Sequence, residues 1–440
     1  MTGHDIDYDV AIVGASLAGA TAATLLARQG LRVALVEKHR SPSTHKVLCT
    51  HFIQSSATPT LRRLGLAERI EAAGGKPNPY QMWTRYGWIK PSFDGDTGYN
   101  IRRSALDPMV RELAGQTPGV DLMLGQRVAG LIERDGAVAG VQIRDRERHV
   151  RDVRSRLVVG ADGHKSAVAW LAGIEEKQRP NARFYCLGYF AGVEMPTAAT
   201  SPSVRSQLWM RDGDYGFALP NDGEVTALAA MALKRHLPAF RQDREAALRR
   251  FIRDLPEAPV IDDAELVSEV VIADEYPLIE RPAVPQPGLA LIGDAALTSD
   301  PVPAVGCGWA FQSGEWLADA VGPALRGSEP LTAGLRRYER AHRFVRRHHR
   351  LIAQDSSGKP FNAVQLQVIA ASARDRELAD RFEAWVSRRA PAFDLMSPST
   401  VARAVRVNRR HRRSQRGEQG KDPSRPAMAE TTEADPAARL

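Results

Sequence analysis

A glycine-rich stretch near the start of the chain has the spacing of a phosphate-binding turn. The sequence GASLAG, residues 14–19, follows an apolar run and precedes a run of small, helix-forming residues. Gly14 permits a tight turn and Gly19 lets the helix approach the strand, while the helix start offers free N–H groups to an anion. Ser16 replaces the second glycine of the usual G-x-G-x-x-G pattern, and its hydroxyl can bond a phosphate oxygen. We therefore predict a pyrophosphate site made by Gly14, Ser16, Leu17, Ala18 and Gly19.

One acid lies at the distance that such a turn requires. Glu37 ends the next apolar run, RVALVE, and the fingerprint places an acid about 20 residues after its first glycine. A carboxylate there binds ribose hydroxyls and repels the 2′-phosphate of NADP. Glu37, with the adjacent Lys38, is therefore predicted to bind the ribose end of FAD or NAD.

A second passage with chemical character is GDAALTSDPVPAVGCGW, residues 293–309. Asp294 follows a buried apolar run, where an acid needs a partner. The prolines and glycines after it lead into a helical run, whose start favours negative charge and whose glycines let a ligand approach the backbone. A third glycine-and-acid strand end, GADG at 160–163, lies between the two motifs. An NAD-binding domain alone explains neither of these later motifs.

The elements that position the first motif are predicted from hydrophobic periodicity. Apolar runs at 8–13 and 32–37 enclose a small-residue helix at 18–29, which ends at Gly30. This strand–helix–strand unit implies a parallel sheet. Asp135-Gly136 predicts a hairpin turn between two alternating segments.

The middle of the chain has a different pattern. From 184 to 233 the sequence alternates and is rich in aromatics, with a turn at 221–223, which indicates an antiparallel sheet in a second domain. A helix is predicted at 239–255, and the chain after Val321 reads as helical to about Ala390.

Three glycine-and-acid strand ends in this order resemble the FAD-dependent aromatic hydroxylases and epoxidases, the single-component flavoprotein monooxygenases. Flavin halogenases and geranylgeranyl reductases share that fold. The resemblance covers residues 5–330 and implies that Asp294 binds the ribityl chain of FAD. The loop matching the family's P-x-x-G-x-G pattern would lie against the flavin ring, and its residues are Pro303, Ala304, Val305, Gly306, Cys307 and Gly308.

Further site residues follow from the same resemblance. HKVLCT resembles the segment that carries a basic residue near the FAD phosphates, which implies this role for Lys46. IRRSALD resembles a helix start with a cofactor-binding arginine, which implies Arg103. Val128 matches a backbone contact to adenine, and Asp162 of the GADG motif matches an acid linked to both FAD and NAD(P)H. The family arginine after this motif is replaced by Ala169, which counts against direct use of NADPH.

The resemblance also implies the fold class, α/β plus an antiparallel sheet. A Rossmann-like, glutathione-reductase-like FAD-binding domain would carry an inserted β-sheet substrate domain and C-terminal helices. The predicted FAD-binding domain comprises 1–75, 98–178 and 282–330, the substrate domain 76–97 and 179–281, the C-terminal helical region 331–400, and a basic, disordered tail 401–440.

The favoured reaction is hydroxylation or epoxidation of an aromatic or polyunsaturated, natural-product-like substrate through a flavin C4a-hydroperoxide. O2 is the co-substrate and NAD(P)H the transient reductant, delivered directly or by a separate flavin reductase; a carrier protein is a further candidate partner. Pro303 would lie at the reacting edge of the flavin, and His51 is a candidate proton-transfer group. No metal-ligand set is visible in the sequence.

An apolar, aromatic substrate is expected from the aromatic residues of the sheet and of the excursion before it. The sheet set is Phe184, Tyr185, Tyr189, Phe190, Trp209, Tyr215 and Phe217, and the excursion set, a predicted lid, is Tyr80, Trp83, Tyr86 and Trp88.

Three alternatives stay open at this point. A reductase of prenyl or alkene groups is favoured by KVLCTHF, which resembles the cysteine-bearing segment of those enzymes. A halogenase is disfavoured, because WTRYGWIKP has the wrong spacing and position for the halogenase motif. A flavin-binding protein without turnover is the non-enzymatic alternative.

Composition limits location and partners. The net charge of +8 is concentrated between Arg403 and Arg416, a segment without acids. It shows neither the interleaved aromatics of nucleic-acid binders nor an amphipathic membrane pattern, so we predict no nucleic-acid partner. Three widely spaced cysteines predict a reducing, cytoplasmic location, and no apolar run is long enough to predict a membrane span.

Overall fold

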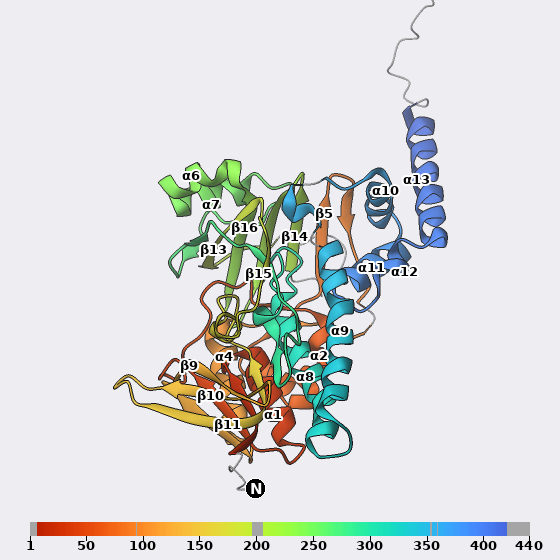
Figure 1. The fold of residues 1–440 in the computed structure, drawn as a ribbon. Helices are drawn as coiled ribbons and strands as arrows, with labels where there is room; N and C mark the ends of the chain where they lie inside the picture. The colour runs from red at the N-terminus through yellow and green to blue at the C-terminus, as the bar shows by residue number, and fades with distance from the viewer. Residues whose placement is uncertain (1–6, 94, 196–205, 353, 359, 420–440) are drawn as a thin grey trace, which may run out of the picture.

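The computed structural model of the chain describes residues 7–93, 95–195, 206–352, 354–358 and 360–419. Two sheets lie one above the other, with helices packed along one side (Figure 1). None of the helices in these ranges has the length and hydropathy needed to span a bilayer.

The lower sheet contains the predicted strand–helix–strand unit. Its strand order is β8-β2-β1-β11-β10-β9, and β20 pairs with β11. β1 lies between parallel partners β2 and β11, β8 and β20 extend the parallel part, and β9 and β10 form an antiparallel extension. The strands are β1 Tyr8–Val13, β2 Val33–Glu37, β8 Val120–Leu124, β9 Arg127–Arg134, β10 Ala137–Arg144, β11 Val150–Gly160 and β20 Leu289–Leu291.

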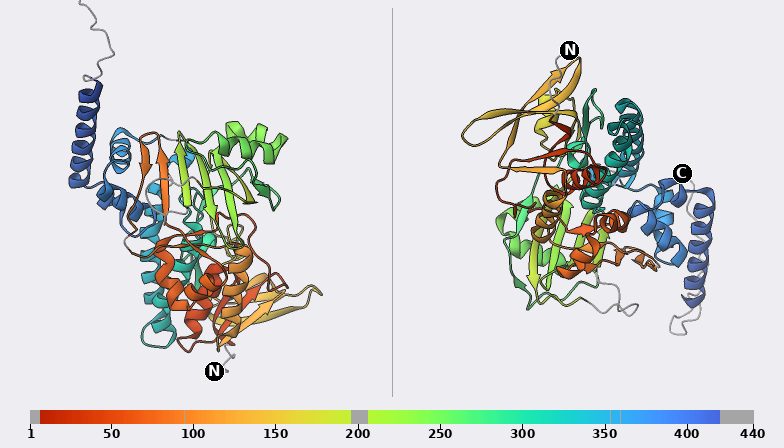
Figure 2. Two further views of the ribbon diagram at one scale, coloured as in Figure 1. Left: turned by 180° about the vertical axis from the view of Figure 1, so that it is seen from behind. Right: turned by 90° about the horizontal axis from the view of Figure 1, so that it is seen from below.

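The residue types of its strands and helices explain why the centre of the lower sheet is buried on both faces. Every side chain of β2 is buried, as expected for a strand covered on both faces. Helix α1 (Leu17–Ala27) is also buried at every position, because its alanines and Gly19 let it fit between the sheet and α8 (Gly306–Leu325). The β9–β10 turn has positive φ at Asp135 and Gly136, which confirms the predicted hairpin. This hairpin projects from the molecule in Figure 2.

The upper sheet has the order β17-β13-β16-β15-β14-β5-β6, with β18 paired to β13. Its long strands are antiparallel, as predicted, and the turn at 221–223 joins β15 to β16. The strands are β5 Tyr80–Thr84, β6 Gly87–Ile89, β13 Arg183–Ala191, β14 Ser206–Arg211, β15 Asp214–Pro220, β16 Val225–Leu233, β17 Glu265–Leu266 and β18 Val271–Ala273.

Two expectations about aromatic residues are wrong. The excursion is not a lid, because β5 pairs in parallel with β14 and becomes part of the sheet. The aromatic set does not all face one cavity, since alternation divides it between two faces. Tyr185 and Tyr215 line the cavities described below, whereas Phe184 and Trp209 pack in a separate core beneath α6 and α7.

Shorter elements connect the two sheets. The predicted helix at 239–255 is split into α6 and α7 at Asp243, whose side chain caps α7. The bounds are β3 Phe52–Ile53, β4 Lys76–Pro77, β7 Tyr99–Asn100, β12 Lys177–Arg179, β19 Leu278–Glu280, α2 Thr58–Leu64, α3 Ala67–Ala72, α4 Arg103–Gln116, α5 Ala167–Leu171, α6 Leu237–Gln242 and α7 Arg244–Arg253.

The C-terminal region is helical further than predicted. Its helices are α9 Leu331–Ile352, α10 Ala363–Ser372, α11 Arg376–Val386, α12 Ala392–Leu395 and α13 Pro398–Gln419. The predicted disordered tail is therefore wrong for 401–419. Buried Ala404 packs into the fold, Arg403 pairs with Asp375 at 2.9 Å, and the Asn408 amide donates to the Gln367 carbonyl. The rest of that prediction, 420–440, lies outside the described residues.

Buried histidines make the stability of this fold depend on pH. His342 on α9 packs against Trp309 with ring centroids 5.4 Å apart, and its Nε2 has no hydrogen-bond partner among the described residues. Burial lowers the pKa of His342 to about 4 and also lowers the pKa of His348 and of His349.

We therefore expect the free energy of unfolding to fall as pH is lowered from about 8 to about 5. An unfolded histidine takes up its proton near pH 6.5 and the buried His342 only near 4, so protons favour the unfolded chain. His342 alone accounts for about 2 kcal/mol over this interval. Urea unfolding at each pH measures the slope, and His342→Phe should reduce it; an equal slope in both proteins contradicts the assignment.

Candidate functional site

The turn between β1 and α1 is built around two glycines. Gly14 has φ +106°, a conformation that L side chains rarely adopt, and a Cβ there would clash with the Ala161 carbonyl. A Cβ on Gly19 would clash with the Gly14 carbonyl, so α1 can approach the turn only with glycine at this position. Ser16 makes no capping hydrogen bond, which leaves the first N–H groups of α1 open to an anion. The turn thus fits the pyrophosphate of FAD.

Glu37 fixes the same turn from the end of β2. Its carboxylate accepts the backbone N–H of Ala15 at 2.9 Å and that of His39 at 3.0 Å. Glu37 is buried and lines the cleft above the turn, as does Lys38. The acid therefore holds the turn in place while facing the ribose position that the sequence predicts.

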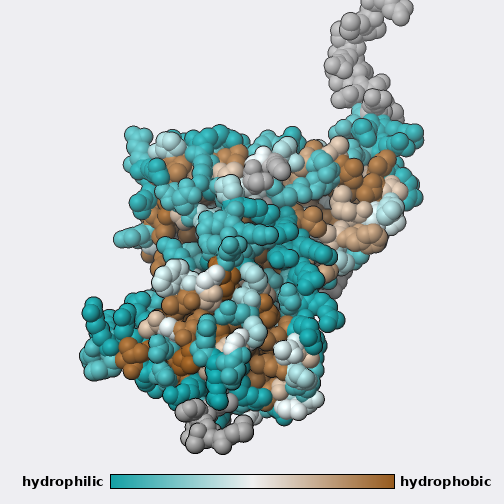
Figure 3. Space-filling view, viewed as in Figure 1, coloured by the Kyte–Doolittle hydropathy of each residue, from teal (hydrophilic) through white to brown (hydrophobic). Residues whose placement is uncertain are grey.

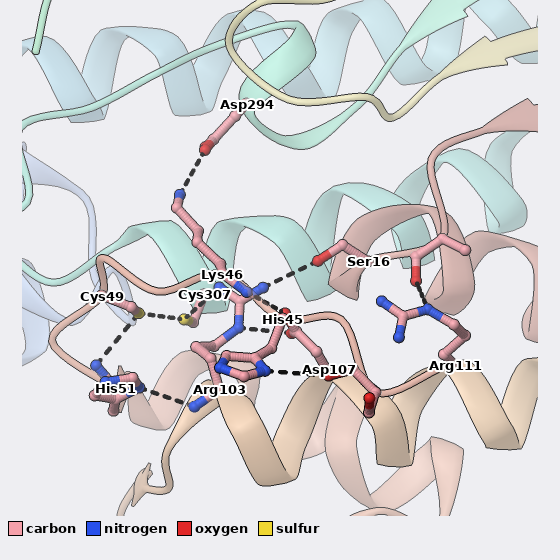
Figure 4. A network of polar contacts seen from close by, with 12 residues as sticks. Ser16, His45, Lys46, Cys49, His51, Arg103, Asp107, Arg111, Asp294 and Cys307 are labelled. Carbon is pink, nitrogen blue, oxygen red and sulfur yellow. Dashed lines mark hydrogen bonds and ion pairs between the residues drawn. The ribbon is translucent and has the colours of Figure 1, made fainter. Parts of the chain in front are cut away.

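A cationic cluster lies on the other side of the turn (Figure 4). The Arg103 guanidinium, buried at the start of α4, donates to Ser16 Oγ at 3.0 Å and to Asp107 Oδ1 at 2.6 Å. Asp107 also accepts the backbone N–H of Lys46 at 2.9 Å. Arg111, one turn further along α4, donates to the Ala15 carbonyl at 3.1 Å. Sequence reasoning missed Asp107 and Arg111, although they follow Arg103 by four and eight residues and so share one face of α4.

Lys46 and Asp294 face each other across the cleft. Their Nζ and Oδ2 atoms are 3.1 Å apart, and the Asp294 carboxylate raises the pKa of Lys46. Asp294 lies in a short turn, Gly293–Ala295, that continues β20, and Ser313 Oγ accepts the Gly293 N–H at 2.9 Å. The Asp107 carboxylate positions the Lys46 backbone and the Ser313 hydroxyl positions Gly293, so both charged groups are held at the same point of the cleft.

The loop between Asp294 and α8 is held by a buried carboxylate. Asp300 accepts the Val302 N–H at 2.8 Å and pairs with Arg183 of β13 at 3.0 Å. The Gln54 amide donates to the Pro303 carbonyl at 2.8 Å. Ala304 has φ +54°, an unfavourable conformation for a residue with a Cβ. Arg183, Asp300 and Gln54 carry no motif signal, so sequence reasoning did not find them.

His51 is held by its neighbours rather than directed at the cleft. Its Nδ1 accepts the Arg103 backbone N–H at 2.9 Å, and its Nε2 contacts the Tyr189 hydroxyl. Burial lowers the pKa of His51, so the ring is neutral with its proton on Nε2. His51 lines neither of the two cavities described next. Its role in proton transfer stays a prediction.

The predicted cofactor residues surround one cleft of about 690 Å³. All of them line the cleft except Gly19, Val305 and Gly308. The lining residues include Val128, Asp162, Gly306 and Cys307. Asp162 accepts hydrogen bonds from Ser166 Oγ and the Val168 N–H at the start of α5. Within the described residues, this cleft brings together the glycine turn, the acids and the cations that FAD requires.

A second, apolar cavity of about 330 Å³ adjoins the cleft. Phe52 and Ala304 line both spaces, and Pro303 lines the apolar cavity. The loop that the sequence places against the flavin ring therefore separates the cofactor cleft from the apolar cavity.

Replacement of Asp294 should weaken FAD binding. Asp294→Ala removes the predicted ribityl contact and leaves Lys46 without its partner, so we expect about 10- to 100-fold weaker binding, the value of one hydrogen bond to a charged group. Fluorescence titration of the apoprotein with FAD measures this. Asp319→Ala is the matched control, since this half-exposed acid on α8 pairs with Arg63; equal affinity in the two variants contradicts the prediction.

Comparison with known proteins agrees with this geometry. The chain is 28% identical over 344 residues to digeranylgeranylglycerophospholipid reductase 1 of Methanococcoides burtonii, covering 76% of this chain and 79% of that protein. The flavin-dependent brominase Bmp2 superposes with a TM-score of 0.74 at 19% identity, covering 93% of this chain and 100% of the brominase.

Two further solved structures have the same fold. The probable FAD-dependent monooxygenase pqsL of Pseudomonas aeruginosa has a TM-score of 0.66 at 21% identity, covering 86% of this chain and 99% of its own. A geranylgeranyl bacteriochlorophyll reductase-like protein of Thermoplasma acidophilum has a TM-score of 0.63 at 20% identity, covering 90% and 95%. The FAD binding domain model matches residues 7–350. The chain therefore belongs to the FAD binding domain family and is an FAD-dependent oxidoreductase.

Proposed function

We propose that this protein is an FAD-dependent reductase that saturates carbon–carbon double bonds in a long apolar chain of the prenyl type. The observation that carries the proposal is the apolar cavity beside Pro303 and Ala304. The names of the sequence relatives, which are reductases of geranylgeranyl chains, support it. The sequence motifs favour a monooxygenase, whereas these two observations favour a reductase.

The walls of the cavity suit a chain of methylenes and methyl groups. The upper sheet contributes Met82 and Leu208, and the C-terminal helices contribute Val368, Ile369 and Phe382, all buried. Such a lining gains free energy by removing hydrocarbon from water and offers little to a charged ligand.

The outer end of the cavity is open and hydrophobic. Phe393 on α12 lines it and is 72% exposed, and Leu351 is 45% exposed. A hydrophobic area beside α10–α12 is visible in Figure 3. A substrate longer than the cavity can therefore keep its polar end outside while a double bond lies beside the Pro303 loop.

In the proposed reaction the protein positions the substrate double bond, excludes water from it and donates a proton. FAD, when bound, supplies the reducing equivalents. Tyr185 and Tyr276 line the cleft on the side of the upper sheet, and burial raises the pKa of both hydroxyls, so both stay protonated. Either hydroxyl can donate the proton that must accompany a hydride, and the Asn181 amide holds that of Tyr185 at 2.6 Å.

A monooxygenase is the second candidate, and one observation favours it. Ser55 Oγ, Tyr80 Oη and Trp385 Nε1 belong to residues that line the apolar cavity, and none of these atoms has a hydrogen-bond partner within the described part of the chain. Polar atoms of this kind suit a substrate that carries a hydroxyl or carbonyl on an aromatic ring.

Product mass distinguishes the two candidates. The FAD-loaded enzyme is reduced with dithionite and offered a geranylgeranyl lipid without oxygen, or supplied with NADPH and an aromatic phenol in air. The reductase adds two hydrogen atoms per double bond in the anaerobic arm, and the monooxygenase adds one oxygen atom in the aerobic arm. An unchanged lipid in the anaerobic arm contradicts the proposed function.

A bulky side chain in the cavity should impair substrate binding without affecting FAD. Ala392→Trp places an indole at the cavity wall, and we expect KM for the lipid to rise roughly tenfold or more while FAD content is unchanged. Asp394→Trp on the same helix α12 is the matched control, because Asp394 is exposed and does not line the cavity. Equal KM values in the two variants would place the substrate elsewhere.

A further inference from the structure

Two cysteines that are 258 residues apart in the chain meet in the wall of the flavin cleft. The Sγ atoms of Cys49 and Cys307 are 3.5 Å apart (Figure 4). Cys49 lies in the segment between β2 and β3 and is half-buried, whereas Cys307 lies in the first turn of α8 and is buried. Both residues line the cleft. The sequence alone places no two cysteines together, so this pair is a product of the fold.

The surroundings of the pair favour a thiolate. The backbone N–H of His51 donates to Cys49 Sγ at 3.3 Å, and Arg103 Nη1 lies 3.8 Å from Cys307 Sγ. The hydrogen bond from Cys307, with the nearby charges of Arg103 and Lys46, holds the pKa of Cys49 well below its usual range. The same hydrogen bond raises the pKa of Cys307. The contacts therefore favour ionisation of Cys49, the more accessible sulfur, and disfavour ionisation of Cys307.

We propose that Cys49 and Cys307 are a redox-active thiol pair that closes to a disulfide in reaction with a peroxide. The Cys49 thiolate attacks one oxygen of hydrogen peroxide, the O–O bond breaks, and hydroxide leaves. Cys307 then attacks the sulfur of the resulting sulfenic acid, and the S–S bond forms as the second oxygen leaves as water. In sum, two thiols and one hydrogen peroxide give one disulfide and two water molecules.

The geometry permits this step with a small movement. A disulfide requires an S–S distance of about 2.0 Å, so the two sulfurs must approach by about 1.5 Å. Cys49 belongs to a loop rather than to a helix or a strand, and this loop can supply the shift. The bond would join the 45–51 segment covalently to the start of α8, between Lys46 and the Pro303 loop.

The position of the cysteine pair beside the flavin cleft indicates the source of the oxidant. Reduced flavins release hydrogen peroxide when oxygen reaches them, so a thiol pair in this wall meets the oxidant where it forms. The inference holds for a reductase and for a monooxygenase alike. The pair thus senses turnover in the presence of oxygen and couples it to the shape of the cofactor cleft.

The chain provides an internal control. Cys186 on β13 is fully buried in the core under α6 and α7, and burial raises its pKa to about 12, which makes it unreactive. FAD-loaded protein is reduced with dithiothreitol, desalted, treated with one equivalent of hydrogen peroxide, denatured, and alkylated with iodoacetamide. Intact mass then counts the free cysteines, and peptide mapping locates any bond.

We expect three alkylated cysteines before peroxide and one, Cys186, after it, with full recovery on renewed reduction. Cys186→Ser should still lose two free thiols. Cys307→Ser should retain Cys49 as a sulfenic acid that dimedone traps, and Cys49→Ser should leave Cys307 unmodified. Far-ultraviolet circular dichroism and the flavin spectrum establish that each variant is folded and loaded.

The wild-type protein alone tests whether the Cys49–Cys307 disulfide forms, even where a variant does not fold. Three alkylated cysteines after peroxide, or a mapped bond that includes Cys186, would overturn the proposal. Oxidation of Cys49 and Cys307 to separate oxygen adducts without a bond between them would overturn it as well. A mapped Cys49–Cys307 bond that dithiothreitol reverses establishes it.

Discussion

The buried ion pair between Arg183 and Asp300 joins the two halves of this protein. Neither side chain is exposed, and Arg183 belongs to the upper sheet while Asp300 follows the last strand of the lower one. A buried pair of this kind contributes little net free energy, but loss of one partner costs about 3–5 kcal/mol because it leaves a charge in the protein interior. The pair therefore fixes how the sheets sit on each other, and with it the shape of the space between them.

The same carboxylate also shapes the loop at the reacting end of the cleft. Asp300 accepts the N–H of Val302, and the Ala304 N–H donates to the Pro301 carbonyl at 2.8 Å. These contacts hold Ala304 in a left-handed conformation that costs of order 1–3 kcal/mol and that a free loop would abandon. The strain persists because Gln54 restrains the loop from the opposite side, and the Arg388 Nε in turn donates to Gln54 at 2.9 Å. The C-terminal helices therefore act on the flavin loop through Gln54.

The sequence predicted those features that are encoded locally. Gly14, Gly19 and Glu37 form one continuous strand–turn–helix–strand unit, and the physical requirements of that unit can be read from neighbouring residues. The Asp135-Gly136 hairpin is local in the same sense. The sequence also predicts Asp294 as a site residue, because a glycine and an acid at a strand end have few structural uses, and the structure places it in the cleft.

Most features that sequence reasoning missed depend on contacts between distant segments, whereas Asp107 and the break at Asp243 were missed despite local contacts. The order of α13 rests on Arg403 and Asn408 binding groups on α10 and at the start of α11, and the arginine-rich composition of the segment does not show this. The sequence around β5 predicts a lid and not a sheet strand, because its partner β14 lies more than a hundred residues later and the pairing has no local signal. The pairing of Cys49 with Cys307 likewise requires the closed cleft.

Under the proposed function, the position of the Pro303 loop explains how one site serves a charged cofactor and an apolar substrate. On one side Lys46, Arg103 and Arg111 provide positive charge for phosphates, and these cations are held by Asp294, Asp107 and backbone carbonyls. On the other side the cavity walls are mostly hydrocarbon, with a few polar residues such as Glu383 among them. A charged group that strayed into the apolar cavity would lose its hydration without compensation, and an alkyl chain in the cleft would displace water from charges. Solvation therefore favours a different ligand in each space, and among the described residues the two spaces share Phe52 and Ala304 as a common wall. The loop held by Asp300 therefore sets the position at which the proposed reaction would take place.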